Sequence, residues 1–168
     1  MFVLGIDPGL SRCGYACVES GRTGPRCTAI GVLRTDPATP LPLRLAELQA
    51  ELRVLMREAR ADVVAIERVF FQVNVRTAMA VGQASGLAMV EAVSAGAEVA
   101  QYSPNEVKLA VAGDGAADKQ SVGLMVQKLL GLAAPPRPAD AADAAALALC
   151  HLAHAPMRQR VAAASAAR

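Results

Sequence analysis

Short apolar runs separated by turn signals fill the first part of the chain. Strand-like runs cover residues 2–6, 15–18 and 28–33, and the segments between them contain an Asp-Pro-Gly turn or several glycines. Runs of this length that are bounded by Gly and Pro are typical of strands joined by tight turns. The pattern predicts an antiparallel meander of three strands.

Helical spacing of apolar residues follows the meander. Between residues 41 and 60, apolar side chains recur three and four positions apart with charged residues between them: Leu45, Leu48, Leu52, Leu55 and Met56. An apolar stripe of this period is typical of an amphipathic helix that packs one face on a core.

Two further strands are separated by an unusually apolar helix. Residues 63–66 are all apolar, which is typical of a central strand buried on both faces, and Glu67 follows at once. Residues 76–95 predict a helix that is small or apolar nearly all round, so we expect it to be covered on more than one side. Residues 98–102 predict the last strand.

Three helices complete the chain. Ser103 followed by Pro104 is a typical helix start, with Ser as the cap and Pro in the first turn. After a Gly-rich loop, residues 119–130 predict a helix. A Pro-rich break then precedes a final helix over residues 139–154.

The order of elements indicates the fold class. Three strands, a helix, a strand, a helix, a strand and further helices fit an α/β protein with a five-stranded mixed sheet covered by helices on both faces. This is the order of the RNase H-like fold. We expect residues 1–155 to form this domain and residues 156–168 to form a flexible tail.

Composition and charge mainly exclude other classes of protein, such as membrane-spanning and zinc-binding proteins. The 168 residues, 54% of them hydrophobic, suffice for the core of one domain, and no apolar run reaches the roughly 18 residues of a membrane span. Cys13, Cys17, His151 and His154 lack the spacing of zinc ligands, so we exclude zinc. The net charge of +2 neither requires nor excludes a nucleic-acid partner. Residues 1–9 contain neither a basic leader nor a small-residue cleavage site, so we expect no export and a cytoplasmic protein.

Four carboxylates stand where this fold would gather functional groups. Asp7 and Glu67 each follow the end of a predicted strand, and they would be neighbours if the first and fourth strands pair. Asp140 and Asp143, three residues apart, project from one face of the final helix. The carboxylates of such a cluster repel one another unless cations neutralise their charge. The cluster therefore predicts bound Mg²⁺ or Mn²⁺. Two such ions about 4 Å apart can activate water and stabilise a leaving oxygen, so phosphodiester hydrolysis is the predicted chemistry.

Each of these acids also has a purely structural interpretation. Asp7 could open an Asp-Pro-Gly turn, and Glu67 could be a solvated strand end. Asp140 and Asp143 could be first-turn acids favoured by the helix dipole. Only together with the strand order do the four residues become a coherent site.

Four segments together resemble the RuvC family of Holliday-junction resolvases: GIDPG at 5–9, IERVFF at 66–71, GQA at 82–84 and ADAADA at 139–144. The resemblance runs from residue 1 to about residue 155. It implies a homodimer that binds a four-way DNA junction and cuts two strands of like polarity symmetrically, in homologous recombination and DNA repair. It also implies metal-binding catalytic roles for the four carboxylates, and a branch-migration complex as partner.

The resemblance further suggests which residues contact DNA. Phe70 matches the aromatic that the family places against junction bases, and we expect it rather than Phe71 to point outward, because consecutive side chains of an extended segment alternate. Lys108 and Lys119 match basic positions of the family, and Arg76 lies just beyond the aromatic pair. These three are candidate phosphate contacts, with a solvated surface position as the alternative for each. Lys119 could also steady the charge that develops on the phosphate.

Three positions near Lys119 depart from the family pattern. The family usually carries a basic or polar residue where Ala116 stands and Gln where Ser121 stands. Asp114 adds a negative charge. We expect it to compete with phosphate for Lys119 and so to reduce junction affinity.

Three other functions fit parts of the pattern. An RNase H-like nuclease acting on RNA would share the G-x-D-x-G start, but Phe70 and the paired Asp140 and Asp143 argue against it. An actin-like or sugar-kinase ATPase needs a duplicated domain, for which the chain is too short. A non-catalytic junction-binding module would tolerate the loss of a carboxylate, whereas all four are present.

Overall fold

The computed structural model describes the backbone of residues 1–69 and 75–166 and the side chains of residues 1–69 and 78–155. Its elements are β1 (Phe2–Asp7), β2 (Arg12–Gly21), β3 (Gly24–Arg34), α1 (Leu41–Ala59), β4 (Val63–Glu67), α2 (Val75–Ser94), β5 (Glu98–Tyr102), α3 (Pro104–Ala112), α4 (Lys119–Leu130) and α5 (Ala139–Ala166). The predicted order of strands and helices is confirmed.

The strands form one mixed sheet in the order β3-β2-β1-β4-β5. The pairs β1–β2 and β2–β3 are antiparallel, whereas β1–β4 and β4–β5 are parallel. The predicted meander is confirmed, and the first and fourth strands do pair, which is the condition under which Asp7 and Glu67 become neighbours. Because β1 and β4 run in the same direction, their carboxyl ends lie at one edge of the sheet.

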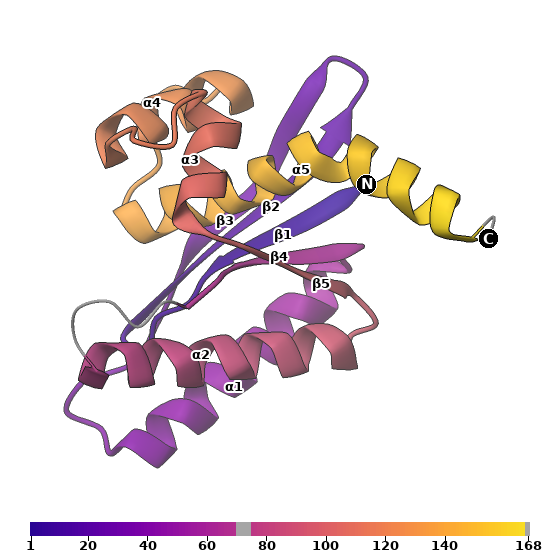
Figure 1. Ribbon diagram of the computed structural model, residues 1–168. Coiled ribbons are helices and arrows are strands. Elements are labelled where there is room, and N and C mark those ends of the chain that lie inside the picture. The colour runs from indigo at the N-terminus through magenta and orange to yellow at the C-terminus, as the bar shows by residue number, and fades with distance from the viewer. Residues whose placement is uncertain (70–74, 167–168) are drawn as a thin grey trace.

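Helices cover both faces of the sheet (Figure 1). α1 and α2 lie on one face, and α3, α4 and α5 lie on the other. Alternate residues of the central strands feed two separate cores, since Val3 and Ala65 pack on the α5 side while Leu4 and Val64 pack on the α1 side. This alternation is the period of two that a strand imposes on its side chains.

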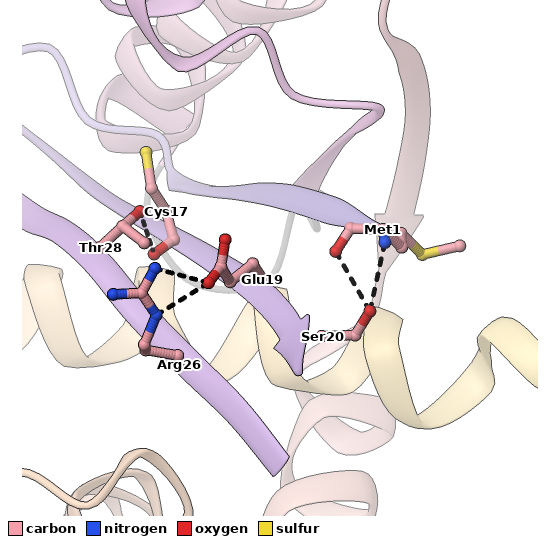
Figure 2. Close-up of polar contacts among 6 residues, drawn as sticks. All are labelled: Met1, Cys17, Glu19, Ser20, Arg26 and Thr28. Atoms are coloured by element: carbon pink, nitrogen blue, oxygen red, sulfur yellow. Dashed lines mark hydrogen bonds and ion pairs between the residues drawn. The ribbon is translucent and has the colours of Figure 1, made fainter. Parts of the chain in front are cut away.

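The β2–β3 hairpin contains one bulge, and Figure 2 shows polar contacts of the residues around it. The register shifts after Cys17, and Thr28 is the extra residue. The hydroxyl of Thr28 donates to the carbonyl of Cys17 at 3.4 Å. Beyond the bulge, Nε of Arg26 donates to Oε1 of Glu19 at 2.8 Å. The ion pair ties the two strands together at the end of the hairpin that lies away from the carboxyl end of β1.

The final helix is longer than the sequence pattern indicated. We predicted that it ends at residue 154, but α5 continues to Ala166, so that boundary was wrong. Four of the five residues 162–166 are alanine, the strongest helix former. The division into a domain of residues 1–155 and a tail of residues 156–168 stays a prediction. None of the helices in the described part of the chain is long and apolar enough to cross a membrane.

The helix α2 is covered on one side only within a single chain. Ala84, Ala88 and Ala92 are fully buried against the sheet and α1. Met79, Val90 and Val93 are 59%, 58% and 67% exposed. The side of α2 that carries these three residues, which we expected to be covered, is therefore exposed among the described residues.

Candidate active site

The four predicted carboxylates line one cavity of ≈ 180 Å³. Asp7 and Glu67 reach it from the ends of two strands, and Asp140 and Asp143 reach it from the first turns of α5. Two lysines complete the charged lining: Lys119, at the first position of α4, and Lys108 of α3 (Pro104–Ala112). The structure thus brings together residues that lie far apart along the chain.

Strand alternation explains why the two strand acids face α5. In β1 and β4, Ile6 and Ile66 pair with each other and pack in the core beneath α1. The next residue of each strand points to the opposite face. Asp7 and Glu67 therefore project side by side toward α5, at the edge where both strands end.

A glycine on the neighbouring strand allows α5 to approach these acids. Gly14 pairs with Asp7 across the β1–β2 ladder. A Cβ atom on Gly14 would overlap the carbonyl oxygen of Asp140, so the first turn of α5 rests directly on the backbone of β2. Gly5 makes the same close approach to the carbonyl oxygen of Ala144. These two contacts fix the start of α5, and with it Asp140, against the end of β1.

The acids repel one another strongly in this arrangement. Burial raises the pKa of Asp7 from 3.8 to about 7, and the charges of Asp143, Glu67 and Asp140 add to the rise. The pKa of Glu67 is also raised, first by burial and then by the charge of Asp143. Lys119 lowers both pKa values. Further positive charge is needed to ionise the cluster fully at neutral pH.

Lys119 already places one positive charge among the acids. Its Nζ donates to Oδ2 of Asp143 at 2.8 Å. This hydrogen bond raises the pKa of the ammonium group, although partial burial opposes the rise. The position of Lys119 follows from the start of α4, where the side chain of Asp118 caps the helix by accepting the N–H of Ser121 at 2.7 Å. The ammonium group therefore stands where a metal cation would relieve the same repulsion.

The donor set fits a hard divalent cation. All four acids offer carboxylate oxygens, the ligands that Mg²⁺ and Mn²⁺ prefer. Burial is the main cause of the raised pKa of Asp7, and the charges of the other acids, which such an ion would neutralise, add to it. Among the described residues, however, no three His, Cys, Asp or Glu side chains stand close enough to hold an ion as they are. Binding would require these side chains to turn inward and Asp143 to exchange its contact with Lys119.

The remaining predicted DNA contacts divide into two groups. Lys108 of α3 lines the same cavity and is half-buried. Phe70 lies outside the described residues, and so does the side chain of Arg76. The proposed contacts of these two residues with DNA stay predictions.

Sequence reasoning missed one charged neighbour of the site. Nε of Arg12 lies 3.4 Å from Oδ2 of Asp140. Arg12 begins β2, which returns antiparallel beside β1 directly after the Asp-Pro-Gly turn. Since that turn holds the start of β2 at the edge where Asp7 stands, the meander itself was the signal that could have pointed to Arg12.

The predicted pairing of Asp114 with Lys119 was wrong, whereas the predicted effect of the Asp114 charge on junction affinity stays a prediction. The carboxylate of Asp114 accepts the N–H of Ala116 at 2.8 Å inside its own turn. Lys119 pairs with Asp143 instead. Ala116 and Ser121, the other two departures from the family pattern, are exposed.

One known family matches almost the whole of this chain. The family described as "Crossover junction endodeoxyribonuclease RuvC" matches residues 3–151. The chain belongs to the RuvC family. A RuvC from Salinispora arenicola is 55% identical, over 98% of this chain and 95% of its own length. RuvC membership confirms the predicted activity, that of an endodeoxyribonuclease that resolves four-way DNA junctions.

Two solved RuvC structures from Thermus thermophilus share the fold. One is RuvC by itself, at 39% identity and a TM-score of 0.86. The other is RuvC in complex with a Holliday junction substrate, at 36% identity and a TM-score of 0.85. Each match covers 94% of this chain and 96% of the other. The predicted RNase H-like fold is thereby confirmed.

Proposed function

We propose that this RuvC-family chain resolves four-way DNA junctions by metal-assisted hydrolysis, with Asp7, Glu67, Asp140 and Asp143 as its metal-binding catalytic residues. The observation that carries this assignment is the shared cavity, in which all four carboxylates and Lys119 line one space. The Thermus thermophilus relative in complex with a Holliday junction substrate supports the same DNA structure as the substrate here.

The metal ligands would come from two parts of the fold. Asp7 and Glu67 would hold metal from the rigid strand ends, and Asp140 and Asp143 from α5. Mg²⁺ or Mn²⁺, with two ions per site, would supply an activated water and stabilise the leaving oxygen of the cut strand. Four carboxylates offer enough oxygen ligands for two such ions.

The basic residues of the cavity would act on the phosphate. Metal binding by Asp143 would free the ammonium group of Lys119, which now donates to Asp143 and lines the same cavity. It would then contact the phosphate group and stabilise the charge that develops during attack. Lys108, on the α3 side of the cavity, would hold the strand in place.

A homodimer would provide the two cuts. Met79, Val90 and Val93 form an exposed apolar stripe along α2 together with Gly82 and Gly86. A Cβ atom on either glycine would meet no atom within 4 Å, so a second copy of α2 could approach closely there. Pairing of this stripe with its symmetry mate would bury it and would place two active sites on one junction. Four further parts of the proposal rest on the family resemblance alone. They are a stacking role for Phe70, a phosphate contact by Arg76, a cytoplasmic location and a branch-migration partner.

The decisive experiment compares DNA structures of matched sequence. Synthetic four-way, three-way and linear duplexes would be incubated with Mg²⁺ or Mn²⁺, and the nicked strands mapped. We expect symmetric paired nicks in two strands of like polarity, in the four-way junction only. Equal cutting of all three substrates would contradict junction selectivity. Binding of the junction without cutting in either metal would instead favour a non-catalytic module, and cutting of RNA substrates in preference would favour the RNA-directed alternative.

A further inference from the structure

The carboxyl edge of the sheet carries a pair of arginines beyond the carboxylate cavity. Arg12 and Arg34 are direct partners across the β2–β3 ladder. Directly opposed residues of antiparallel strands point to the same face, with Cβ atoms roughly 5 Å apart. Arg12 points to the α5 face, where it reaches Asp140, so Arg34 projects beside it on that face.

Only one of the two arginines, Arg12, forms an ion pair among the described side chains. Asp140 lies 3.4 Å from Nε of Arg12, and no ion pair to Arg34 occurs among the described side chains. The nearby carboxylate of Asp36 accepts the N–H of Ala38 at 2.9 Å, inside its own turn. Like charges directly opposite each other destabilise a sheet, and a bound anion relieves that cost.

A third arginine holds the two strand ends together from the other side of the sheet. Arg44 of α1 donates from Nη2 to Oγ of Ser11 at 2.6 Å and from Nε to Oγ1 of Thr35 at 3.0 Å. The hydroxyl of Thr35 in turn donates to the carbonyl of Leu10 at 2.6 Å. Ser11 precedes Arg12 and Thr35 follows Arg34, so these bonds fix the backbone on which the arginine pair stands. An exposed pair on such a rigid base needs little reordering to bind an anion.

We propose that Arg12 and Arg34 form a second phosphate-binding site, which holds the DNA backbone on the β2–β3 side of the cleavage cavity. The inference rests on the proposed function, because the polyanion at this edge is the strand that the carboxylates cut. Lys108 and Lys119 would hold the same DNA on the α3–α4 side. In the structure, Arg12 lies against Asp140. Metal binding by Asp140 would free the guanidinium group for phosphate, which such a group can bind through two parallel N–H groups.

The test is a salt titration of junction binding in Ca²⁺, which permits binding while suppressing cleavage. Arg34→Ala is the cleaner variant because it leaves the Arg12–Asp140 contact in place, and Arg12→Ala is measured beside it. Because the proposed homodimer carries two copies of each arginine, each variant should flatten the slope of log affinity against log salt by roughly 1.8, twice the roughly 0.9 of one phosphate contact. Raising salt from about 50 to about 200 mM should then weaken binding roughly 12-fold less than in the parent.

Three controls separate a phosphate contact from other effects. Arg22→Ala removes one exposed arginine at the far end of the same hairpin and should leave the slope unchanged. Arg12→Lys and Arg34→Lys keep the charge and should keep most of the slope. Thermal unfolding should show that the variants remain folded, as expected for exposed side chains.

The outcomes distinguish this inference from the proposed function. If the parent binds and cuts junctions but Arg12→Ala and Arg34→Ala behave like Arg22→Ala, the arginine pair does not hold DNA and the inference fails alone. If the parent shows no preference for junctions over linear duplex, the proposed function itself fails.

Discussion

Nζ of Lys119 lies 2.8 Å from Oδ2 of Asp143, inside the cavity that Asp7 and Glu67 also line. An amine from α4 and a carboxylate from α5 are thus paired in a space whose acids otherwise repel one another. A metal ion would need the oxygen that this amine now occupies. The Lys119–Asp143 contact therefore links metal binding to the release of a cation for the phosphate.

Lys119→Ala tests this exchange directly. Removing the ammonium group leaves the acids without their internal cation, so we expect tighter Mn²⁺ or Mg²⁺ binding in the absence of DNA, measured by titration calorimetry. Cleavage should slow by roughly a hundredfold or more, because a group that stabilises developing charge is lost. Lys128→Ala, at the other end of α4, should change neither property. Unaltered metal affinity together with an unaltered rate would show that Lys119 takes no part in the site.

The four carboxylates are tested by replacing each with its amide. Asp7→Asn, Glu67→Gln, Asp140→Asn and Asp143→Asn should each abolish cleavage and leave junction binding in Ca²⁺ nearly intact, because a lost metal ligand affects the chemistry more than the phosphate contacts. Asp114→Asn is the matched control, since that carboxylate bonds within its own turn, and it should cut normally. Parallel loss of binding and cleavage in the four variants would argue against the assignment.

The raised pKa of Asp7 predicts how stability depends on pH without metal. The pKa is about 7 in the folded protein, against 3.8 ordinarily. Between these values the folded protein keeps a proton that the unfolded chain has lost, so the free energy of unfolding falls as pH rises through this window. In EDTA, the melting temperature should drop by several degrees between pH 4 and pH 7, and the raised pKa of Glu67 acts in the same direction.

Two comparisons isolate the contribution of the acid cluster. Asp7→Asn should remove most of the decline, because the amide does not titrate. Saturating Mg²⁺ should also remove it, because the ion stabilises the ionised carboxylates of the folded state. A melting temperature that rises over the same window in EDTA, or one that falls equally in Asp7→Asn, would contradict the raised pKa.

The dimer is tested on the exposed stripe of α2. Val90→Glu places a charge on an apolar side chain that is 58% exposed in the single chain, so the monomer should still fold while the dimer dissociates. Light scattering should show a dimer for the parent and a monomer for the variant, and paired nicking should be lost. Leu124→Glu on α4, where the leucine is 51% exposed, is the matched control and should stay dimeric. A monomeric parent at micromolar concentration would refute the proposal.

Local patterns in the sequence determined most of the elements. Ser103 and Pro104 predicted a helix start, and the structure has a full capping box there, in which Ser103 and Glu106 satisfy each other's backbone N–H groups. The last strand and the helix of residues 119–130 match their predicted bounds. Such features depend on neighbours within a few residues of the chain, and the sequence displays these neighbours directly.

Only the tertiary structure decided which charges meet. Asp7 and Glu67 could be nominated from the sequence because each stands at the end of a predicted strand. The meander could also place Arg12 at the same edge of the sheet, but no sequence pattern paired Arg12 with Asp140 or Lys119 with Asp143. Both pairings depend on how closely α5 approaches the sheet. That approach is set by Gly14 of β2, where the absence of a side chain lets the first turn of α5 contact the strand backbone. Local spacing carries no information about such distances, because contacts between remote segments follow from packing rather than from periodicity.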